Sequence, residues 1–285
     1  MARVVGCICT SHAPEIADAM TRGVQSEPHW APFFSAYPPV RAWLEKIRPD
    51  AAVVFYNDHG LNFFLDNMPM FAIGAAVEYR HEDEGRGIPA LGSYPGHPGL
   101  SWHIMESLVG EEFDPASCQK MLVDHAFAIP MRLLWPDSGL APPPVVPIAI
   151  NTVQHPLPST RRCYKLGQAV GRAIESYSED LKVAVIGTGG LSHQVEDTHA
   201  SAVGRGFDQL CMRKLVDDPH ALLHYSIEDL METAGPEGVE LILWIAARGA
   251  MTGAVRELHS HYQAPIGNRA AGLLVLEPVR GARAS

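Results

Sequence analysis

The segment Val183-Ala-Val-Ile-Gly-Thr-Gly-Gly-Leu-Ser-His193 contains the pattern that decides the fold. Its first five residues form a short apolar run rich in Val and Ile, which is typical of a strand buried on both faces. The glycines that follow predict a tight turn, and the turn leads to a serine and a histidine. Five further runs of the same kind predict more buried strands: Val4–Cys9, Ala51–Tyr56, Met70–Ala75, Val145–Ile150 and Leu273–Leu276.

Helical patterns fill the intervals between these predicted strands. The clearest is amphipathic and runs from Thr160 to Tyr177, with Ser159 placed to cap its first turn. Other helical patterns end near Ile47 or cover residues 100–108, 206–216, 227–233 and 239–251. Strands that alternate with helices predict an α/β fold with a central, mostly buried sheet flanked by helices. Because no repeat or low-complexity linker interrupts the pattern, we expect a single domain spanning residues 1–285.

Composition and charge argue against several classes of protein. The chain has 285 residues, of which 47% are hydrophobic and 19% charged, as in ordinary folded domains. Its formal net charge is -10 and no basic run stands out, so we expect no binding to nucleic acid. No apolar stretch reaches membrane-spanning length, and the N-terminus lacks the order of a secretory signal. Five scattered cysteines predict reduced thiols and a cytoplasmic location.

Histidine is the one unusual feature of the composition, with 14 residues in the chain. His12, His59 and His193 each follow an apolar run that predicts a strand, and His125 follows a weaker run. In open α/β sheets, ligands bind in the crevice outside the carboxyl ends of the strands. A single histidine there is more often structural, but four histidines from separate segments predict a shared site.

Glu240 is the fifth candidate for this site. It lies in the segment from Val239 to Ala247, where all the other residues are apolar. A helix that is apolar on every side is predicted to be buried. A buried carboxylate needs a partner, because an unpaired one is costly. The sequence leaves two kinds of partner open: a metal ion, or an arginine such as Arg248 or Arg213.

His12, His59 and Glu240 together would supply two imidazoles and one carboxylate. That set is the facial triad of non-haem iron(II) oxygenases, which leaves coordination positions open for substrate and dioxygen. Zinc accepts the same ligands, so a zinc-dependent hydrolase is the alternative. The His-Glu-x-x-His motif of zinc proteases is absent from the sequence. The spacing of these residues in the sequence does not by itself separate the two metals.

In its motifs the chain resembles the type III extradiol dioxygenases, most closely the catalytic beta subunits of the protocatechuate 4,5-dioxygenase group. The motifs occur along nearly the whole chain: Ser11-His12, Tyr56–His59, Asp83–Gly85, Gly96–Pro98 with Trp102–Ile104, Val123–His125, Thr188–Gln194, Glu237–Glu240 with Trp244, and Arg248–Ala250. The resemblance implies one α/β domain that cleaves the ring of a carboxylated catechol and incorporates both atoms of O2. The expected substrate is protocatechuate, opened by 4,5-cleavage, or a relative such as gallate or 3-O-methylgallate.

The resemblance also implies roles for individual residues. The expected cofactor is Fe(II), which His12, His59 and Glu240 would bind, and His193 would be the catalytic acid–base residue. A non-catalytic member of the family, acting as a scaffold, is a further alternative. The presence of His193 argues against that alternative.

Three more residues are expected near the substrate. By the resemblance, His125 and Asn57 would lie close to the bound catechol or to dioxygen. Related proteins place small polar residues near the substrate carboxylate, in a region that corresponds to Pro265–Ala270. Arg269 departs from that pattern, and we predict that it binds the carboxylate, because a buried anion needs a cation or hydrogen-bond donors.

Some relatives carry a small helical lid subunit, and others have the lid fused to the catalytic chain. Because this chain ends soon after the predicted strand Leu273–Leu276, we expect no C-terminal lid within it. The expected partners are therefore a separate lid (alpha) subunit and further copies of the chain, in a homodimer or a heterotetramer.

Overall fold

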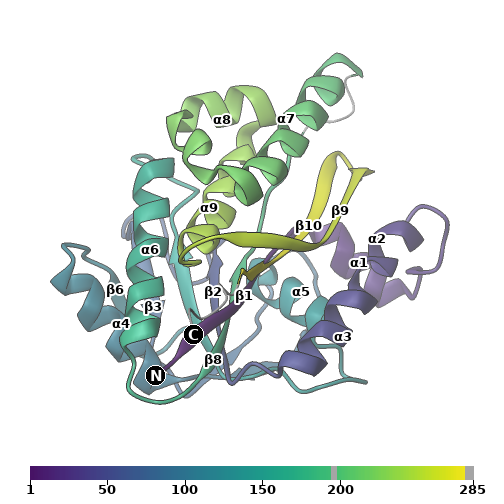
Figure 1. Ribbon diagram of the computed structural model, residues 1–285. Helices are drawn as coiled ribbons and strands as arrows, with labels where there is room; N and C mark the ends of the chain where they lie inside the picture. The colour runs from purple at the N-terminus through teal and green to yellow at the C-terminus, as the bar shows by residue number, and fades with distance from the viewer. Residues whose placement is uncertain (194–197, 280–285) are drawn as a thin grey trace.

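An eight-stranded mixed sheet forms the centre of the computed structural model, which describes residues 1–193 and 198–279, with the backbone alone at 198–203 (Figure 1). Gln194, the last residue of one motif above, lies outside the described residues. The strands are β1 (Arg3–Thr10), β2 (Ala51–Tyr56), β3 (Phe71–Gly74), β6 (Ala116–Cys118), β7 (Val145–Ile150), β8 (Lys182–Gly187), β9 (Val255–Ile266) and β10 (Arg269–Pro278). Their order in the sheet is β6-β3-β7-β2-β8-β1-β10-β9. A separate two-stranded sheet pairs β4 (Glu78–Arg80) with β5 (Ser93–Pro95).

The four central strands, β7, β2, β8 and β1, all run parallel to one another. Antiparallel pairs adjoin this parallel block on both sides: β3 pairs with β7, and β10 pairs with β1 and β9. The central strands are almost entirely buried, as the continuous Val- and Ile-rich runs predict.

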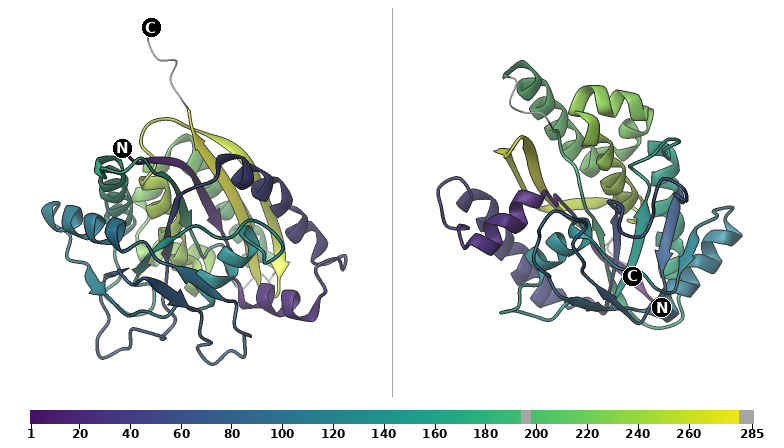
Figure 2. Two further views of the ribbon diagram at one scale, coloured as in Figure 1. Left: turned by 90° about the horizontal axis from the view of Figure 1, so that it is seen from below. Right: turned by 180° about the vertical axis from the view of Figure 1, so that it is seen from behind.

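Helices cover both faces of the sheet. They are α1 (Pro14–Arg22), α2 (Ala31–Ser35), α3 (Tyr37–Ile47), α4 (Pro98–Gly110), α5 (His125–Leu134), α6 (Thr160–Ser176), α7 (Thr198–Asp217), α8 (Ile227–Ala234) and α9 (Leu241–Gly249), with 3-10 turns at Pro219–His224 and Pro236–Glu240. One hydrophobic core joins the sheet to α4, α6 and α9, and a second joins it to α1, α2, α3 and α5. Figures 1 and 2 show these two helical layers on opposite sides of the strands.

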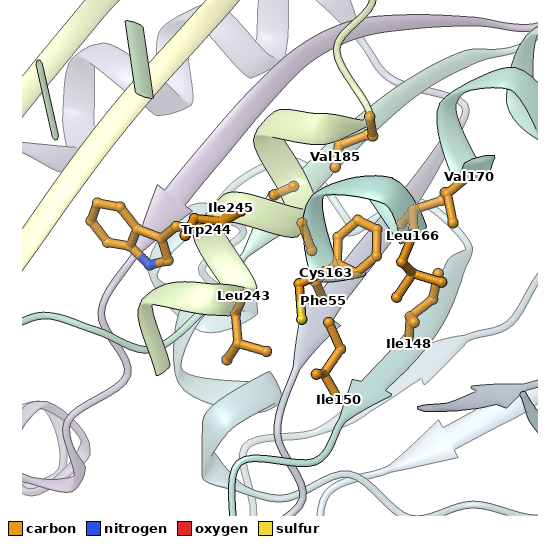
Figure 3. Close-up of a cluster of buried hydrophobic side chains, with 14 of the residues drawn as sticks. Phe55, Ile148, Ile150, Cys163, Leu166, Val170, Val185, Leu243, Trp244 and Ile245 are labelled. Carbon is orange, nitrogen blue, oxygen red and sulfur yellow. The ribbon is translucent and has the colours of Figure 1, made fainter. Parts of the chain in front are cut away.

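Helix α9 packs closely against both α6 and the parallel strands. Figure 3 shows Leu243 and Ile245 of this helix beside residues of α6 and of the parallel strands, whereas the ring of Trp244 points away from them. A Cβ atom on Gly167 of α6 would lie only 1.9 Å from the carbonyl oxygen of Ala246. Glycine at this position therefore allows the two helix backbones to approach each other.

The predicted fold class is confirmed, and the six predicted strands correspond to observed ones with small changes at their ends. The helix from Thr160 also forms, and the Ser159 side chain accepts a hydrogen bond from the backbone N–H of Arg162, as predicted. The helical prediction at 239–251 was partly wrong, because its first residues form a 3-10 turn. Strand β9 was missed, since it is half-exposed and lacks an apolar run. None of the described helices is long and apolar enough to span a membrane.

Candidate metal centre

Polar residues from four neighbouring strands meet at one edge of the sheet. Because β7, β2, β8 and β1 are parallel, their carboxyl ends lie at the same edge. His12 follows β1, Asn57 and His59 follow β2, Thr152 follows β7, and Thr188 follows β8. The topology therefore explains how residues far apart in the sequence reach a common site.

Glu240 joins these residues from the end of the 3-10 turn that leads into α9, and it is only 5% exposed. Its Oε2 lies 3.4 Å from Nε2 of His12, and its Oε1 lies 3.6 Å from Nε2 of His59. The arginines considered as alternative partners lie elsewhere: Arg248 donates to backbone carbonyl groups, and Arg213 is exposed. The carboxylate thus faces both histidines.

The remaining ring nitrogen of each histidine has a partner of its own. Nδ1 of His12 lies 3.2 Å from Oγ1 of Thr188, and Nδ1 of His59 lies 2.9 Å from Oδ2 of Asp124. Because a carboxylate can only accept, Nδ1 of His59 carries the hydrogen, and Nε2 is left facing Glu240. Metal-binding histidines are commonly oriented by such a second hydrogen bond.

The charges of this cluster call for a cation between the side chains. Burial alone would lower the pKa of His59, but Asp124 and Glu240 outweigh it and raise that pKa to about 10. Burial alone would raise the pKa of Glu240, yet His12 and His59 hold it well below its usual value. Without a proton or a metal ion, Nε2 of His59 and the carboxylate would be two acceptors facing each other. Two imidazole nitrogens and a carboxylate fit Fe(II) or zinc.

A second possible ligand set overlaps with this one. Ring nitrogens of His12, His59 and His125 lie within 4.8 Å of one another. However, Nδ1 of His125 is engaged by the carboxylate of Glu84, and an all-histidine set would leave the Glu240 carboxylate without a counter-charge. We therefore favour Glu240 as the third ligand and place His125 beside the centre.

Asn57 contacts the same cluster through its side-chain amide. Its Nδ2 lies 3.0 Å from Oε1 of Glu240 and 3.0 Å from Oγ1 of Thr152. Its Oδ1 is buried without a partner in the described part of the chain. An unpaired buried oxygen of this kind can accept a hydrogen bond from a ligand.

His193 follows the turn at Gly189 and Gly190 after β8. Gly189 has a φ of 80°, and a Cβ there would lie 2.9 Å from the Glu240 side chain, so glycine lets the turn pass close to the carboxylate. Nδ1 of His193 lies 3.0 Å from the carbonyl oxygen of Leu191 and donates to it. Burial lowers the pKa of His193 although nearby carboxylates raise it, which leaves a neutral imidazole at neutral pH.

Comparison with known proteins identifies the family of this chain. The family described as the catalytic LigB subunit of aromatic ring-opening dioxygenase matches residues 6–273. The chain belongs to this family. The predicted relationship to the type III extradiol dioxygenases is thereby confirmed.

Two curated relatives of this LigB-family chain cover it in part. Gallate dioxygenase of Pseudomonas putida is 40% identical over 196 residues, which are 68% of this chain and 57% of that protein. The 2,3-dihydroxyphenylpropionate/2,3-dihydroxicinnamic acid 1,2-dioxygenase of Klebsiella pneumoniae is 34% identical over 154 residues, which are 54% of this chain and 46% of that protein. The chain therefore spans about half the length of the curated relatives it matches.

A solved structure supports the fold alone. The crystal structure of an uncharacterized protein from Escherichia coli K12 superposes with a TM-score of 0.52 at 12% identity. The superposition covers 95% of the LigB-family chain and 99% of the other chain.

Sequence reasoning missed several contacts of the LigB-family site. Asp124 and Thr188 were seen only as parts of motifs, whereas the structure places them on the outer nitrogens of His59 and His12. Asp124 also accepts a hydrogen bond from the backbone N–H of Ala126 and caps α5. An aspartate directly before a helix is typical of an N-cap, so the sequence does not indicate that Asp124 also binds Nδ1 of His59.

Asp208 on α7 is a further buried carboxylate near the site. It accepts hydrogen bonds from both the N–H and the hydroxyl of Ser192, at 3.0 and 2.7 Å, and from the Tyr262 hydroxyl at 2.9 Å. Burial nevertheless raises the pKa of Asp208 to about 6. Because Ser192 precedes His193, Asp208 fixes the backbone that carries this histidine.

Arg269 begins β10 and pairs through its guanidinium with Glu15 of α1. Its backbone forms a bridge with His193, so it lies beside the turn described above. The predicted contact between Arg269 and a substrate carboxylate stays a prediction.

Proposed function

We propose that this chain is the catalytic unit of a non-haem iron(II) extradiol dioxygenase that opens the ring of a carboxylated catechol. The observation that carries the proposal is the buried Glu240, which faces the Nε2 atoms of His12 and His59 while both Nδ1 atoms are held by other partners. Family membership supports the same reaction class. A relative named gallate dioxygenase supports a carboxylated, hydroxylated ring as the substrate.

In this proposal, His12, His59 and Glu240 would hold the metal, and a set of three protein ligands would leave coordination positions for substrate and dioxygen. An iron(II) ion in this position would supply Lewis acidity toward the ring hydroxyls and the electron-transfer chemistry that dioxygen requires. Both atoms of O2 end in the ring-opened product.

His193 moves the proton in this reaction. Its Nδ1 donates to a backbone carbonyl, so the neutral ring offers Nε2 as a base toward a hydroxyl of the catechol. The resulting imidazolium then returns the proton to an oxygen atom as the ring opens. Asn57 and His125 lie beside Glu240 and His59, where they would contact the substrate or dioxygen.

The surroundings of the reaction are proposals as well. Arg269 would bind the substrate carboxylate, and a separate helical lid subunit would cover the site in a homodimeric or heterotetrameric assembly. A cytoplasmic location fits the five cysteines, which are all unpaired.

The test is oxygen uptake by protein loaded anaerobically with Fe(II) or, in parallel, with zinc. Protocatechuate, gallate and 3-O-methylgallate are each supplied to both forms. We expect one O2 consumed per catechol by the iron form alone. No uptake with any catechol by iron-replete protein would overturn the proposal, and hydrolytic activity of the zinc form would favour a hydrolase.

A further inference from the structure

The loop between β4 and β5 is shaped around the side chain of Asp83. This carboxylate accepts hydrogen bonds from four successive backbone N–H groups, those of residues 85 to 88, at 2.8 to 3.2 Å. Gly85 and Gly87 have φ values of 94° and 77°, which other residues rarely adopt. The loop is thus a defined turn, and it sets the direction of the neighbouring Glu84.

The side chain of Glu84 is buried although the residue lies on this surface loop. Its side chain is 3% exposed, whereas that of Glu82, two residues earlier, is 43% exposed and pairs with Arg80. Oε1 of Glu84 contacts Nδ1 of His125 and lies 3.1 Å from Nε of Arg86. A carboxylate is buried at considerable cost unless it is paired, so this placement requires a reason.

The contact determines which ring nitrogen of His125 carries the hydrogen. Because the Glu84 carboxylate can only accept, Nδ1 of His125 is the donor, and Nε2 is left with its lone pair. Among the described residues, Nε2 makes no hydrogen bond. The His125 ring lies 4.4 Å from the His59 ring and 5.4 Å from the His12 ring, measured between centroids. Glu84 therefore prepares an acceptor nitrogen beside the proposed ligands.

A metal bound by Glu84 itself is a weaker explanation. Glu84, Asp124 and His125 offer ligand atoms within 4.8 Å of one another. However, Asp124 already accepts hydrogen bonds from His59 and Ala126, and Glu84 is neutralised by Arg86. Hydrogen bonds and the ion pair account for both oxygens of Asp124, for Nδ1 of His125 and for Oε1 of Glu84, whereas Oε2 of Glu84 is buried without a partner among the described residues.

We infer that Glu84 is a positioning residue, which holds His125 in the tautomer that presents Nε2 to the substrate. The inference rests on the proposed function of the same centre and adds a residue of the 81–92 loop to it. Since Glu84 is placed by the turn around Asp83, the loop and the orientation of His125 are coupled. The hydrogen-bond partners that orient metal-binding histidines contribute about 10–100-fold to metal affinity or activity, and we expect an effect in the same range on activity here.

Three variants of the full chain test the inference. Glu84→Ala removes the acceptor, Glu84→Gln keeps an acceptor oxygen without the charge, and Glu82→Ala is the matched control on the same loop. In zinc-loaded protein with 15N-labelled histidine, NMR reports the tautomer of His125, whose signal is assigned by its loss in His125→Gln. In iron-loaded protein, kcat, KM, iron per chain and melting temperature are measured.

We expect Glu84→Ala to lose the Nδ1–H tautomer of His125 and to lower kcat about 10–100-fold, with iron content and melting temperature unchanged. Glu84→Gln should keep the tautomer and recover most of kcat, and Glu82→Ala should match the wild type. An alanine variant with unaltered tautomer and kcat would overturn the inference, as would a loss of kcat that follows a loss of iron. If Glu84→Ala does not fold, Glu84→Leu, which fills a similar space without an acceptor, is measured in its place, and an unaltered tautomer and kcat in that variant overturn the inference equally. Failure of the proposed function is recognised separately, as absence of oxygen uptake by the wild type.

Discussion

Two adjacent regions of the molecule differ in what holds them together. The first, the apolar region, is the close-packed interface of α6, α9 and the parallel strands. The second, the polar region, is the cluster of polar side chains at the carboxyl ends of those strands. In the apolar region, the arrangement of the elements is determined by the shapes that pack together: Gly167 allows the backbones of α6 and α9 to make contact, and Trp244 is fully buried in the hydrophobic core. In the polar region, the orientation of the side chains is determined by hydrogen bonds: Nδ1 of His12 and Nδ1 of His59 each have a partner. The same strands and helices therefore carry an apolar core and a charged site, and the two kinds of side chain occupy separate places.

The border between the two regions is only one or two residues wide. Phe55 of β2 packs in the core, and Asn57, just after the end of this strand, contacts the Glu240 carboxylate. On the approach to α9, Glu240 faces the histidines, while Leu241 to Gly249 are all buried among apolar side chains. Rigid core elements thus hold the polar groups, which is what a preorganised site requires.

Replacing Glu240 should have the largest effect in the polar region. In Glu240→Gln, the anion that faces His12 and His59 is lost, so we expect loss of iron. We also expect activity to fall by more than the factor of about 10²–10⁴ that is typical for loss of an acid–base residue. Iron per chain and oxygen uptake measure both effects. The control is Glu237→Gln, since Glu237 is exposed in the same 3-10 turn. Full iron content in Glu240→Gln would contradict its role as a ligand.

His193 should affect turnover without affecting the metal. We expect His193→Phe to lower the oxygen-uptake rate about 10²–10⁴-fold while iron content and melting temperature stay unchanged. His224→Phe, at an exposed position, is the control. A drop in melting temperature with an active folded fraction would make His193 structural, and a drop in iron would make it a ligand.

The pH profile provides a second measurement on His193. Burial lowers its pKa, so the neutral base persists as pH falls below the usual histidine value of about 6.5. The acidic limb of the rate profile should therefore lie below that value in the wild type and disappear in His193→Phe.

A substitution in the apolar region should lower the stability of the fold and leave iron binding unchanged. In Gly167→Ala the new Cβ would meet the carbonyl oxygen of Ala246 at 1.9 Å, so α6 and α9 must separate. We expect the free energy of unfolding to fall by about 3 kcal/mol, the upper range for overpacking. Urea unfolding measures it, and iron per folded chain should be retained. Gly206→Ala is the matched control, because nothing lies within 4 Å of a Cβ at that helical position.

The same contrast explains what could be predicted from the sequence. The central strands were predictable because continuous Val and Ile runs mark burial on both faces, and Glu240 was conspicuous among apolar neighbours. Strand β9 was not, because an edge strand with half-exposed residues has no such run. The pairs His59–Asp124 and His125–Glu84 join residues 65 and 41 positions apart. Such pairing depends on how loops fold, and no local pattern reveals it.

Asp208 combines features of the polar and the apolar region. It is hydrogen-bonded like the polar residues, yet burial raises its pKa from 3.8 to about 6. A raised folded-state pKa means that its contribution to stability is present below about pH 3.8 and is lost as pH rises through 6. Relative to Asp208→Asn, the wild type should lose roughly 3 kcal/mol of unfolding free energy over that interval. Urea unfolding of both proteins at pH 4 and pH 7 measures the difference, and a constant difference would contradict it.

Arg269 should give the smallest effect, and one confined to a single class of substrate. Its guanidinium already pairs with Glu15, so a substrate carboxylate would have to share or displace that partner. A hydrogen bond to a charged group contributes about 1.5–3 kcal/mol, so Arg269→Ala should raise KM for protocatechuate about 10–100-fold and leave KM for catechol unchanged. Glu15→Gln frees the guanidinium and should lower KM for protocatechuate alone. If Arg269 serves only to join β10 to α1, both variants will instead lower the melting temperature and change the two KM values equally. The comparison of two substrates on two variants thus separates a binding residue of the polar region from a structural ion pair at its border.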